Sequence, residues 1–155
     1  MALHARPAGA FALLLVLAGC VGTLPVVGDP TPETVEAQVV GAASSGGRCV
    51  ADPTVGMAVE SRPADGARLV TVAGNVTVPA ANHVLDETNL TRTGPAAYRL
   101  DVNTTESDSK PDRTCPSGGV VRYEVTVRLP ADGGYELEIR HDGEPVSAIG
   151  SGGES

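Results

Sequence analysis

The sequence predicts an all-β protein, an antiparallel β-sandwich of about seven strands, and three observations lead to this expectation. The 155 residues include 19 Gly and 12 Pro, and Val, Thr and Ala are common among the rest. This composition favours short strands and turns over long helices. Several segments alternate apolar and polar residues with a period of two, as half-buried strands do. Gly or Pro separates these segments, and the chain length suits one small domain.

The N-terminus has the composition and order of an export signal. A short basic region with Arg6 precedes an uncharged apolar run over residues 11–17. The run ends in Leu17-Ala18-Gly19-Cys20, which resembles the lipobox of prokaryotic lipoproteins. The resemblance implies that residues 1–20 are a lipoprotein signal peptide, that cleavage occurs before Cys20, and that Cys20 carries the membrane lipid.

An uncleaved anchor helix is the alternative interpretation. No charged residue occurs from Ala8 to Gly28, a stretch close to the length that crosses a hydrocarbon core. Gly19, Gly22 and Pro25 disfavour a continuous helix there. Under both interpretations the charge order places everything after this stretch outside the cytoplasm. The lipobox interpretation places the chain, lipid-anchored, on the outer face of the cytoplasmic membrane.

The region after the signal is expected to be a flexible tether at residues 21–32, because it combines Pro and Gly without alternation. In an oxidising compartment the two remaining cysteines, Cys49 and Cys115, are expected to form a disulfide. Closing a loop of about 65 residues stabilises a fold by roughly 4 kcal/mol in the chain-entropy model. Two free thiols or half of a metal site are the alternatives. Neither cysteine belongs to a CxxC pair or has a nearby His, which disfavours zinc.

Four segments show clear strand alternation. From Arg68 to Val78 the even positions are Val or Gly and the odd positions are mostly polar, with an expected bend at Gly74. The segments at 98–104, 121–129 and 135–140 repeat the pattern. Less regular segments at 34–40, 54–60 and 83–91 bring the total to about seven.

The last two clear segments match each other face for face when folded about Asp132. Val127 would then oppose Leu137, and Arg128 would oppose Glu136. This match favours an antiparallel hairpin. The alternative is that residues 130–134 turn a corner between two sheets.

The sandwich is expected over residues 33–147, followed by a disordered tail at 148–155. Its pattern resembles small immunoglobulin-like or fibronectin-III-like domains, in which a Tyr marks such a corner, as Tyr135 would here. The resemblance covers architecture only, because Trp is absent and both cysteines are expected before strands rather than inside them. The segment Gly134–Ile139 also resembles the end of carboxypeptidase-regulatory-like, transthyretin-type domains.

The charge balance argues against nucleic acid as a partner. The 19 acidic and 11 basic residues leave a net charge of −8, which repels polyanions. Lys110 is the only lysine. This composition is typical of a salt-adapted secreted protein, such as one from an archaeon, although a GC-rich genome also favours Arg over Lys.

The chain offers few residues for catalysis. His83 and His141 have no sequence-local acid, thiol or hydroxyl arranged as a nucleophile system, and both are expected at partly exposed polar positions. The GxSxG, HExxH and phosphate-loop motifs are absent, and Cys115 lacks the neighbouring His and Met of a cupredoxin copper site. The acidic loop at 106–112 has oxygen ligands that suit calcium, but it lacks the EF-hand order, so a solvated loop is expected. The sequence therefore predicts no enzyme, no cofactor and no metal site.

Three sequons without Pro begin at Asn75, Asn89 and Asn103. Alternation places Asn75 and Asn103 on outward faces. In a host that glycosylates its surface proteins, all three are candidate glycosylation sites.

These features predict a membrane-anchored extracytoplasmic lipoprotein whose sandwich is a non-catalytic binding or structural module. Its expected partners are the membrane lipid on Cys20 and an envelope protein, a glycan or a small ligand that the loops contact. The alternative is an accessory domain of an exported enzyme or transporter complex, recruited through a sheet edge or the acidic face.

Overall fold

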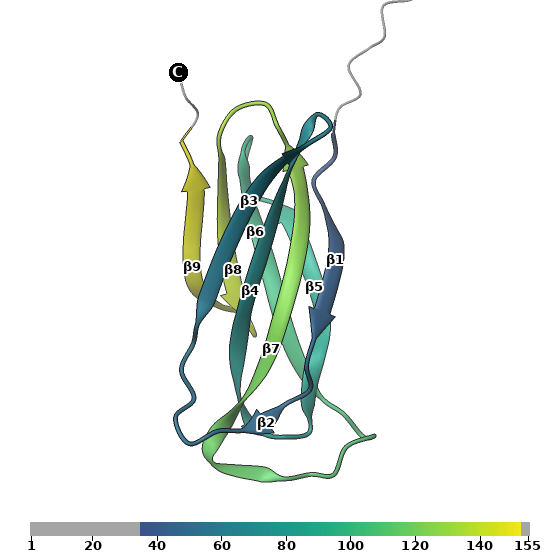
Figure 1. Ribbon diagram of the computed structural model, residues 1–155, viewed down its shortest axis with the longest axis vertical. Helices are drawn as coiled ribbons and strands as arrows, with labels where there is room; N and C mark the ends of the chain where they lie inside the picture. The colour runs from purple at the N-terminus through teal and green to yellow at the C-terminus, as the bar shows by residue number, and fades with distance from the viewer. Residues whose placement is uncertain (1–34, 153–155) are drawn as a thin grey trace, which may run out of the picture. The chain divides into compact units, whose positions relative to one another are not determined.

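The computed structural model describes residues 35–152 and has, within that range, nine strands and no helix. In chain order the strands are β1 (Gln38–Ser44), β2 (Arg48–Cys49), β3 (Met57–Ala64), β4 (Ala67–Ala80), β5 (His83–Arg92), β6 (Ala97–Glu106), β7 (Thr114–Pro130), β8 (Tyr135–His141) and β9 (Glu144–Ser151). They form two sheets packed face to face, so the expected all-β sandwich is confirmed (Figure 1). The predicted signal peptide or anchor helix and the tether lie outside the described residues.

The first sheet, sheet A, contains β1, β7, β4 and β3 in that order, and β2 pairs with the beginning of β7. All of its strand pairs are antiparallel. The long strands β4 and β7 lie side by side from Ala67 opposite Pro130 to Ala80 opposite Thr114. This register places the valine rows of both strands on one side of the sheet, where they are buried.

The second sheet, sheet B, has the order β5, β6, β8 and β9. The pairs β5–β6 and β8–β9 are antiparallel, whereas β6 and β8 are parallel. They are parallel because β7, which lies between them in the chain, runs back through sheet A. The expected antiparallel pairing therefore holds at every other strand pair, and this pair is the exception.

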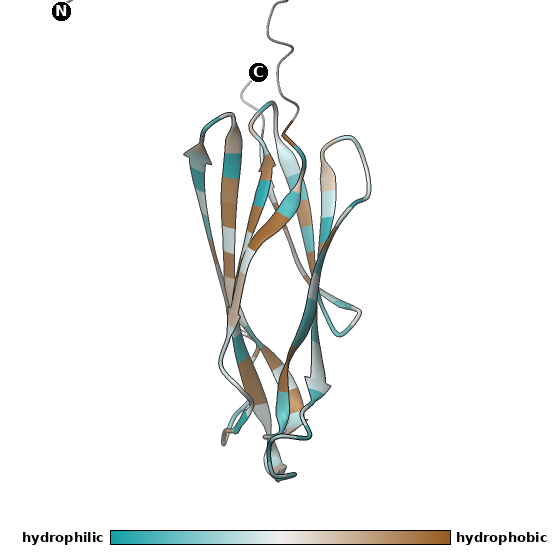
Figure 2. Ribbon diagram, turned by 90° about the vertical axis from the view of Figure 1, so that its right-hand side faces the viewer, coloured by the Kyte–Doolittle hydropathy of each residue, from teal (hydrophilic) through white to brown (hydrophobic). Residues whose placement is uncertain are grey.

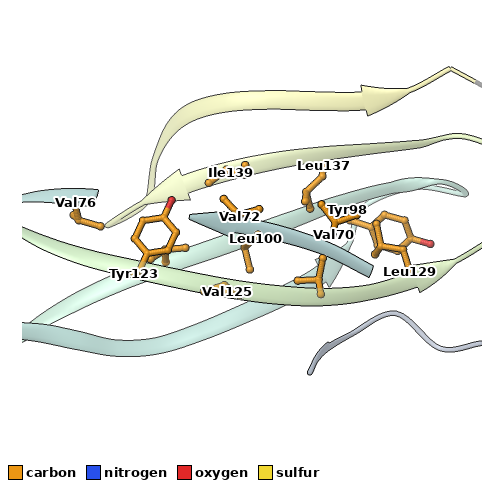
Figure 3. Packing of buried hydrophobic residues seen from close by; sticks show 12 residues of the cluster. Val70, Val72, Val76, Tyr98, Leu100, Tyr123, Val125, Leu129, Leu137 and Ile139 are labelled. Atoms are coloured by element: carbon orange, nitrogen blue, oxygen red, sulfur yellow. The ribbon is translucent and has the colours of Figure 1, made fainter. Parts of the chain in front are cut away.

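The core fills the space between the two sheets and is built almost entirely from aliphatic side chains and two tyrosines. Hydrophobic and hydrophilic residues alternate along the strands, as the sequence predicts (Figure 2). The buried cluster consists of Val70, Val72, Val76, Tyr98, Leu100, Val102, Tyr123, Val125, Val127, Leu129, Leu137 and Ile139 (Figure 3).

The predicted hairpin of residues 121–129 with 135–140 is wrong, and the alternative of a corner between sheets is confirmed. β7 pairs with β1, β2 and β4, whereas β8 pairs with β6 and β9. Residues 130–134 thus cross from sheet A to sheet B. The apolar rows of β7 and β8 both face the core from opposite sheets, so Arg128 and Glu136 lie on opposite outer surfaces. Alternation reveals which side of a strand is buried, but not which strand lies beside it.

Several strand boundaries differ from the expected ones. β1 and β3 each lie a few residues later in the chain than predicted, and β2 and β9 are strands that the sequence pattern does not predict. β9 extends to Ser151, past the predicted boundary at residue 147, because Val146 and Ile149 pack against the core. Cys49 and Cys115 lie inside β2 and β7, contrary to the expectation that they precede strands.

Candidate functional site

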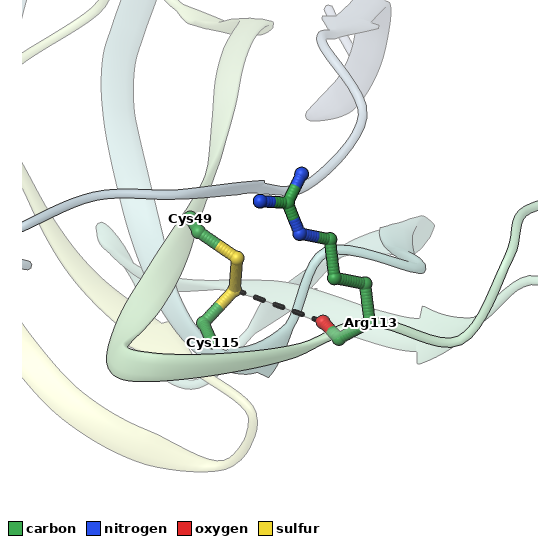
Figure 4. The surroundings of a disulfide bond; sticks show 3 residues. All are labelled: Cys49, Arg113 and Cys115. Carbon is green, nitrogen blue, oxygen red and sulfur yellow. Dashed lines mark hydrogen bonds between the residues drawn. A yellow bond between two sulfur atoms is a disulfide. The ribbon is translucent and has the colours of Figure 1, made fainter.

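One end of the sandwich holds the disulfide, His83 and the acidic loop. We call this end the stapled end and define it as residues 45–56, 81–83 and 107–119. It lies opposite the end at which β1 begins and β9 finishes (Figure 1). Cys49 and Cys115 form the predicted disulfide there, with 5.1 Å between their Cα atoms and a separation of 66 positions in sequence (Figure 4).

The backbones of β2 and β7 lie very close together beside this disulfide. Gly119 pairs with Cys49, and a Cβ added at Gly119 would lie 2.8 Å from the carbonyl oxygen of Arg48 and 3.1 Å from Sγ of Cys115. Only glycine fits without a shift of the backbone. The dashed line in Figure 4 joins Sγ of Cys115 to the carbonyl oxygen of Arg113 at 3.9 Å. An oxidised sulfur has no proton to donate, so we treat this approach as a contact.

Backbone hydrogen bonds connect the loops of the stapled end to one another. Gly47 N donates to the carbonyl oxygen of His83 at 2.7 Å, and Val50 N donates to that of Gly118 at 3.2 Å. Two further bonds of this kind are Ala81 N to Arg113 O and Ser107 N to Asn82 O. The disulfide therefore closes a set of loops that is also held by main-chain bonds, which suits a presented binding surface.

The side chain of Asn75, in β4, holds the loop before β3. Its Oδ1 accepts a hydrogen bond of 2.8 Å from Gly56 N, and its Nδ2 donates to the carbonyl oxygen of Thr54. The first sequon asparagine is thus outward-facing, as predicted, but its amide is already engaged.

A small hollow of about 180 Å³ lies beside Asn75. Its lining residues are Arg48, Val50, Asp52, Thr54, Asn75, Val120 and Arg122. Both arginine side chains are exposed, and neither belongs to the ion pairs found in residues 35–152, Arg99–Asp101 and Arg140–Glu138. The hollow therefore offers guanidinium donors to a polar or anionic group, with Asp52 as the opposing charge.

The other predicted modification sites lie elsewhere. Asn89 is exposed in β5, and Asn103 is half-buried on the outer side of β6. Asn89 lies opposite Asp101, two residues from Asn103 on β6, so these two sequons share one part of sheet B. Cys20, the predicted lipidation site, lies outside the described residues.

His141 is buried, contrary to the expectation of a partly exposed position; it is 6% exposed. Its Nε2 lies 2.8 Å from Oη of Tyr123, so this hydrogen bond links β8 in sheet B to β7 in sheet A. Burial lowers the pKa of His141, against a smaller opposing effect of Asp142, and raises the pKa of Tyr123 to about 12.

Gly74 makes room for this pair. It lies directly opposite Tyr123, and a Cβ at Gly74 would lie 2.7 Å from Oη of Tyr123. The sequence pattern does not predict this pair. A glycine in the core-facing row of a strand is the signal that could have indicated a bulky neighbour.

His83 and the acidic loop were the remaining candidates for chemistry. His83 is half-buried at the start of β5, and its Nδ1 has no hydrogen-bond partner among the described residues. In the loop, Oγ of Ser107 and Oγ of Ser109 are 2.8 Å apart, and Lys110 N donates to the carbonyl oxygen of Ser107. Within residues 35–152, no three His, Cys, Asp or Glu side chains are grouped closely enough to hold a metal ion.

A larger cavity of about 490 Å³ lies at the opposite end of the sandwich. It is lined by Val35, Glu36, Ala37, Leu90, Arg92, Tyr98 and Pro130. Nε of Arg92 is engaged with the carbonyl oxygen of Gly94 at 2.9 Å, so its guanidinium stabilises the β5–β6 turn.

Nothing in the described part of the chain is a helix that could span a membrane. Comparison of the chain with protein-family models, curated proteins and solved structures found no match.

Proposed function

We propose that this protein is a membrane-anchored extracytoplasmic lipoprotein, held by lipid on Cys20, whose sandwich is a non-catalytic binding or structural module. The binding surface in this proposal is the stapled end. An envelope protein or a glycan is the expected class of partner.

The observation that carries the proposal is the placement of the chain ends relative to the stapled end. The described chain enters the sandwich just before β1 and leaves it just after β9, and β1 begins and β9 ends at the end opposite β2 and its disulfide (Figure 1). A tether attached before Val35 would therefore hold the sandwich by one end and present the stapled loops away from the membrane.

Two further features support the proposal. A disulfide is typical of proteins that fold in an oxidising compartment, which agrees with the export signal in the sequence. The stapled end also combines a disulfide-linked framework with exposed Arg48, and exposed Arg122 lines the same hollow; arginine is the type of side chain that recognises carboxylate and other planar polar groups.

The test is intact mass spectrometry of the full chain extracted from the membranes of a prokaryotic host, with and without reductant. We expect a mass that begins at Cys20 and includes lipid, and a gain of two hydrogen atoms on reduction. The Cys20→Ser variant should lose the lipid mass, whereas Cys49→Ser should keep it. An unprocessed wild-type chain without lipid would contradict the anchor.

A further inference from the structure

Sheet A ends in β1 and β3, and sheet B ends in β5 and β9. β1 packs beside β5 on one side of the sandwich, so the edges that remain open are β3 and β9 on the other side (Figure 1). An unprotected edge strand exposes unpaired N–H and C=O groups that can pair with another strand. Charged residues and proline in the middle of the strand prevent such pairing.

β3 carries this protection and β9 does not. Glu60, Arg62 and Pro63 occupy the second half of β3. In β9 no charged residue follows Glu144, and Pro145 lies before the shift in register with β8. After that shift, residues 147–151 pair regularly with β8. The part of β9 without a charge, a proline or a bulge is therefore its last five residues, Ser147-Ala148-Ile149-Gly150-Ser151.

This segment is complementary to itself in the antiparallel direction. When two copies are centred on Ile149, Ile149 lies opposite Ile149, Ala148 opposite Gly150, and Ser147 opposite Ser151. No bulky side chain opposes another except the central isoleucines, and no charge opposes a like charge. A two-fold dimer needs a surface of this self-complementary kind.

We propose that β9 pairs with β9 of a second copy of this chain, antiparallel and centred on Ile149, so that the two sheets B become one continuous sheet. The inference concerns the described residues alone and does not depend on the lipid anchor. Its partner is identified by the near-palindrome of residues 147–151.

An unsatisfied polar atom supports this register independently. Oγ of Ser151 is buried and has no hydrogen-bond partner among the described residues. In the proposed pair it lies opposite Ser147 of the second copy, on the same side of the sheet. Cross-strand hydroxyl pairs of this kind stabilise sheets, so rotation of the Ser151 hydroxyl toward the second copy would give it the partner that it lacks in the monomer.

The net charge supports the choice of this edge. With a net charge of −8, two copies repel each other over most of their surfaces. Residues 145–152 are uncharged, and on the neighbouring strand β8 the carboxylate of Glu138 is already paired with Arg140 at 2.7 Å. Two copies can therefore approach at residues 147–151 of β9 with no charged side chain on the paired strands themselves.

The register is tested by cysteine cross-linking of the full chain in detergent, under mild oxidation. We make Ser147→Cys and Ser151→Cys separately, and mix them. Because residue 147 lies opposite residue 151, the mixture should form a covalent dimer, whereas each variant alone should form little. The parent chain measures any background from Cys20.

A second variant tests the edge without relying on cross-linking. Ala148 is exposed, so Ala148→Lys should fold while placing two like charges on diagonal neighbours of the paired strands. We expect it to weaken dimerisation, measured by sedimentation, about tenfold. Ala58→Lys, an equally exposed site on β3, is the matched control and should leave dimerisation unchanged.

Equal cross-linking of the mixture and of each variant alone would overturn the proposal, and so would a mixture that forms no covalent dimer. Dimerisation that Ala148→Lys leaves unchanged would overturn it as well. A chain that stays monomeric but binds a synthetic uncharged β-strand peptide would also overturn it, because the edge would then take a foreign strand. None of these outcomes bears on the lipid mass at Cys20, so failure here is distinguishable from failure of the proposed function.

Discussion

Tyr123 and His141 form a buried polar contact between sheets that are otherwise held by aliphatic side chains. The two rings meet edge to face, with 5.4 Å between their centroids and an angle of 86°. Nδ1 of His141 is buried without a hydrogen-bond partner in the described chain. A protonated imidazole would therefore place a charge in the core with no hydrogen-bond partner on Nδ1.

We predict that acidification destabilises the fold through His141. Burial lowers the folded-state pKa of His141 below the ordinary value of 6.5. The unfolded chain therefore binds the proton first, so this contribution is complete above pH 6.5 and is lost as the pH falls through the folded-state pKa. One such group changes the free energy of unfolding by at most about 1.4 kcal/mol per pH unit.

Urea denaturation of wild type and His141→Gln at several pH values checks this. Below pH 6.5 the free energy of unfolding should fall less steeply with falling pH in the variant, because the contribution of His141 is gone. The titration of surface carboxylates remains in both proteins. Identical slopes for the two proteins would show that the imidazole is protonated without cost.

Gly74 is required by the ring of Tyr123 and not by its own backbone angles. We predict that Gly74→Ala destabilises the fold by about 1–3 kcal/mol, because the new Cβ would overlap the phenol. Gly41→Ala is the matched control, since a Cβ there meets no atom within 4 Å. Chemical denaturation of both variants measures the difference, and equal stabilities would mean that Tyr123 moves aside at no cost.

Among the sequons, the structure distinguishes Asn75 from Asn89. Nδ2 of Asn75 donates to the carbonyl oxygen of Thr54, whereas Asn89 is exposed. In a host that attaches N-glycans to exported chains, we predict that Asn89→Gln removes glycan mass and that Asn75→Gln does not. Peptide mass mapping reads the result directly, and glycan found on Asn75 would contradict the prediction.

At the scale of the elements, the disulfide anchors the short strand β2 beside β7. β2 has only two residues, and both pair with β7 near the bridge. We predict that Cys115→Ser lowers the free energy of unfolding by about 2–5 kcal/mol and exposes the amides of Arg48 and Val50 to hydrogen exchange. Cys20→Ser is the control and should leave the stability of the sandwich unchanged.

β9, one of the two strands that alternation does not predict, has a local signal in the sequence. Asp142-Gly143 connects β8 to β9 with φ angles of 48° and 87°, as type I′ hairpin turns require. Thr104 N also donates to Oδ1 of Asp142 at 2.6 Å, which fixes this turn against β6. An Asp-Gly pair directly after a clear strand therefore predicts a hairpin, and it was available in the sequence. β2 has no comparable signal, because its two residues are strand only through their contacts with β7.

For the whole molecule, the arrangement of strands can be tested by paired cysteines. Oγ1 of Thr71 and Oγ1 of Thr126 are 3.0 Å apart across β4 and β7. We predict that Thr71→Cys with Thr126→Cys forms an intramolecular disulfide under mild oxidation. Arg128→Cys with Glu136→Cys should not, because these residues lie on opposite outer surfaces. A disulfide in the second variant would mean that β7 and β8 pair as a hairpin, contrary to the structure.

The sequence alone determined the properties that depend on local pattern. Alternation identified the clear strands and their buried faces, because a side chain on a half-buried strand can reach only one side. The two cysteines after the signal region were enough to predict the bridge between Cys49 and Cys115. The N-terminal signal and the lipid on Cys20 remain predictions, since those residues lie outside the described part of the chain.

Only the tertiary structure decided which strands are neighbours and which polar groups meet. By pattern alone, β7 could pair with β8 or with β4. It pairs with β4 because a hydrogen-bonded ladder forms along most of β7, between residues that are far apart in sequence. The contact of Tyr123 with His141, the engagement of Asn75 and the bare edge at β9 all follow from that choice. Local pattern cannot supply them, because a period of two is satisfied equally by a strand in either sheet.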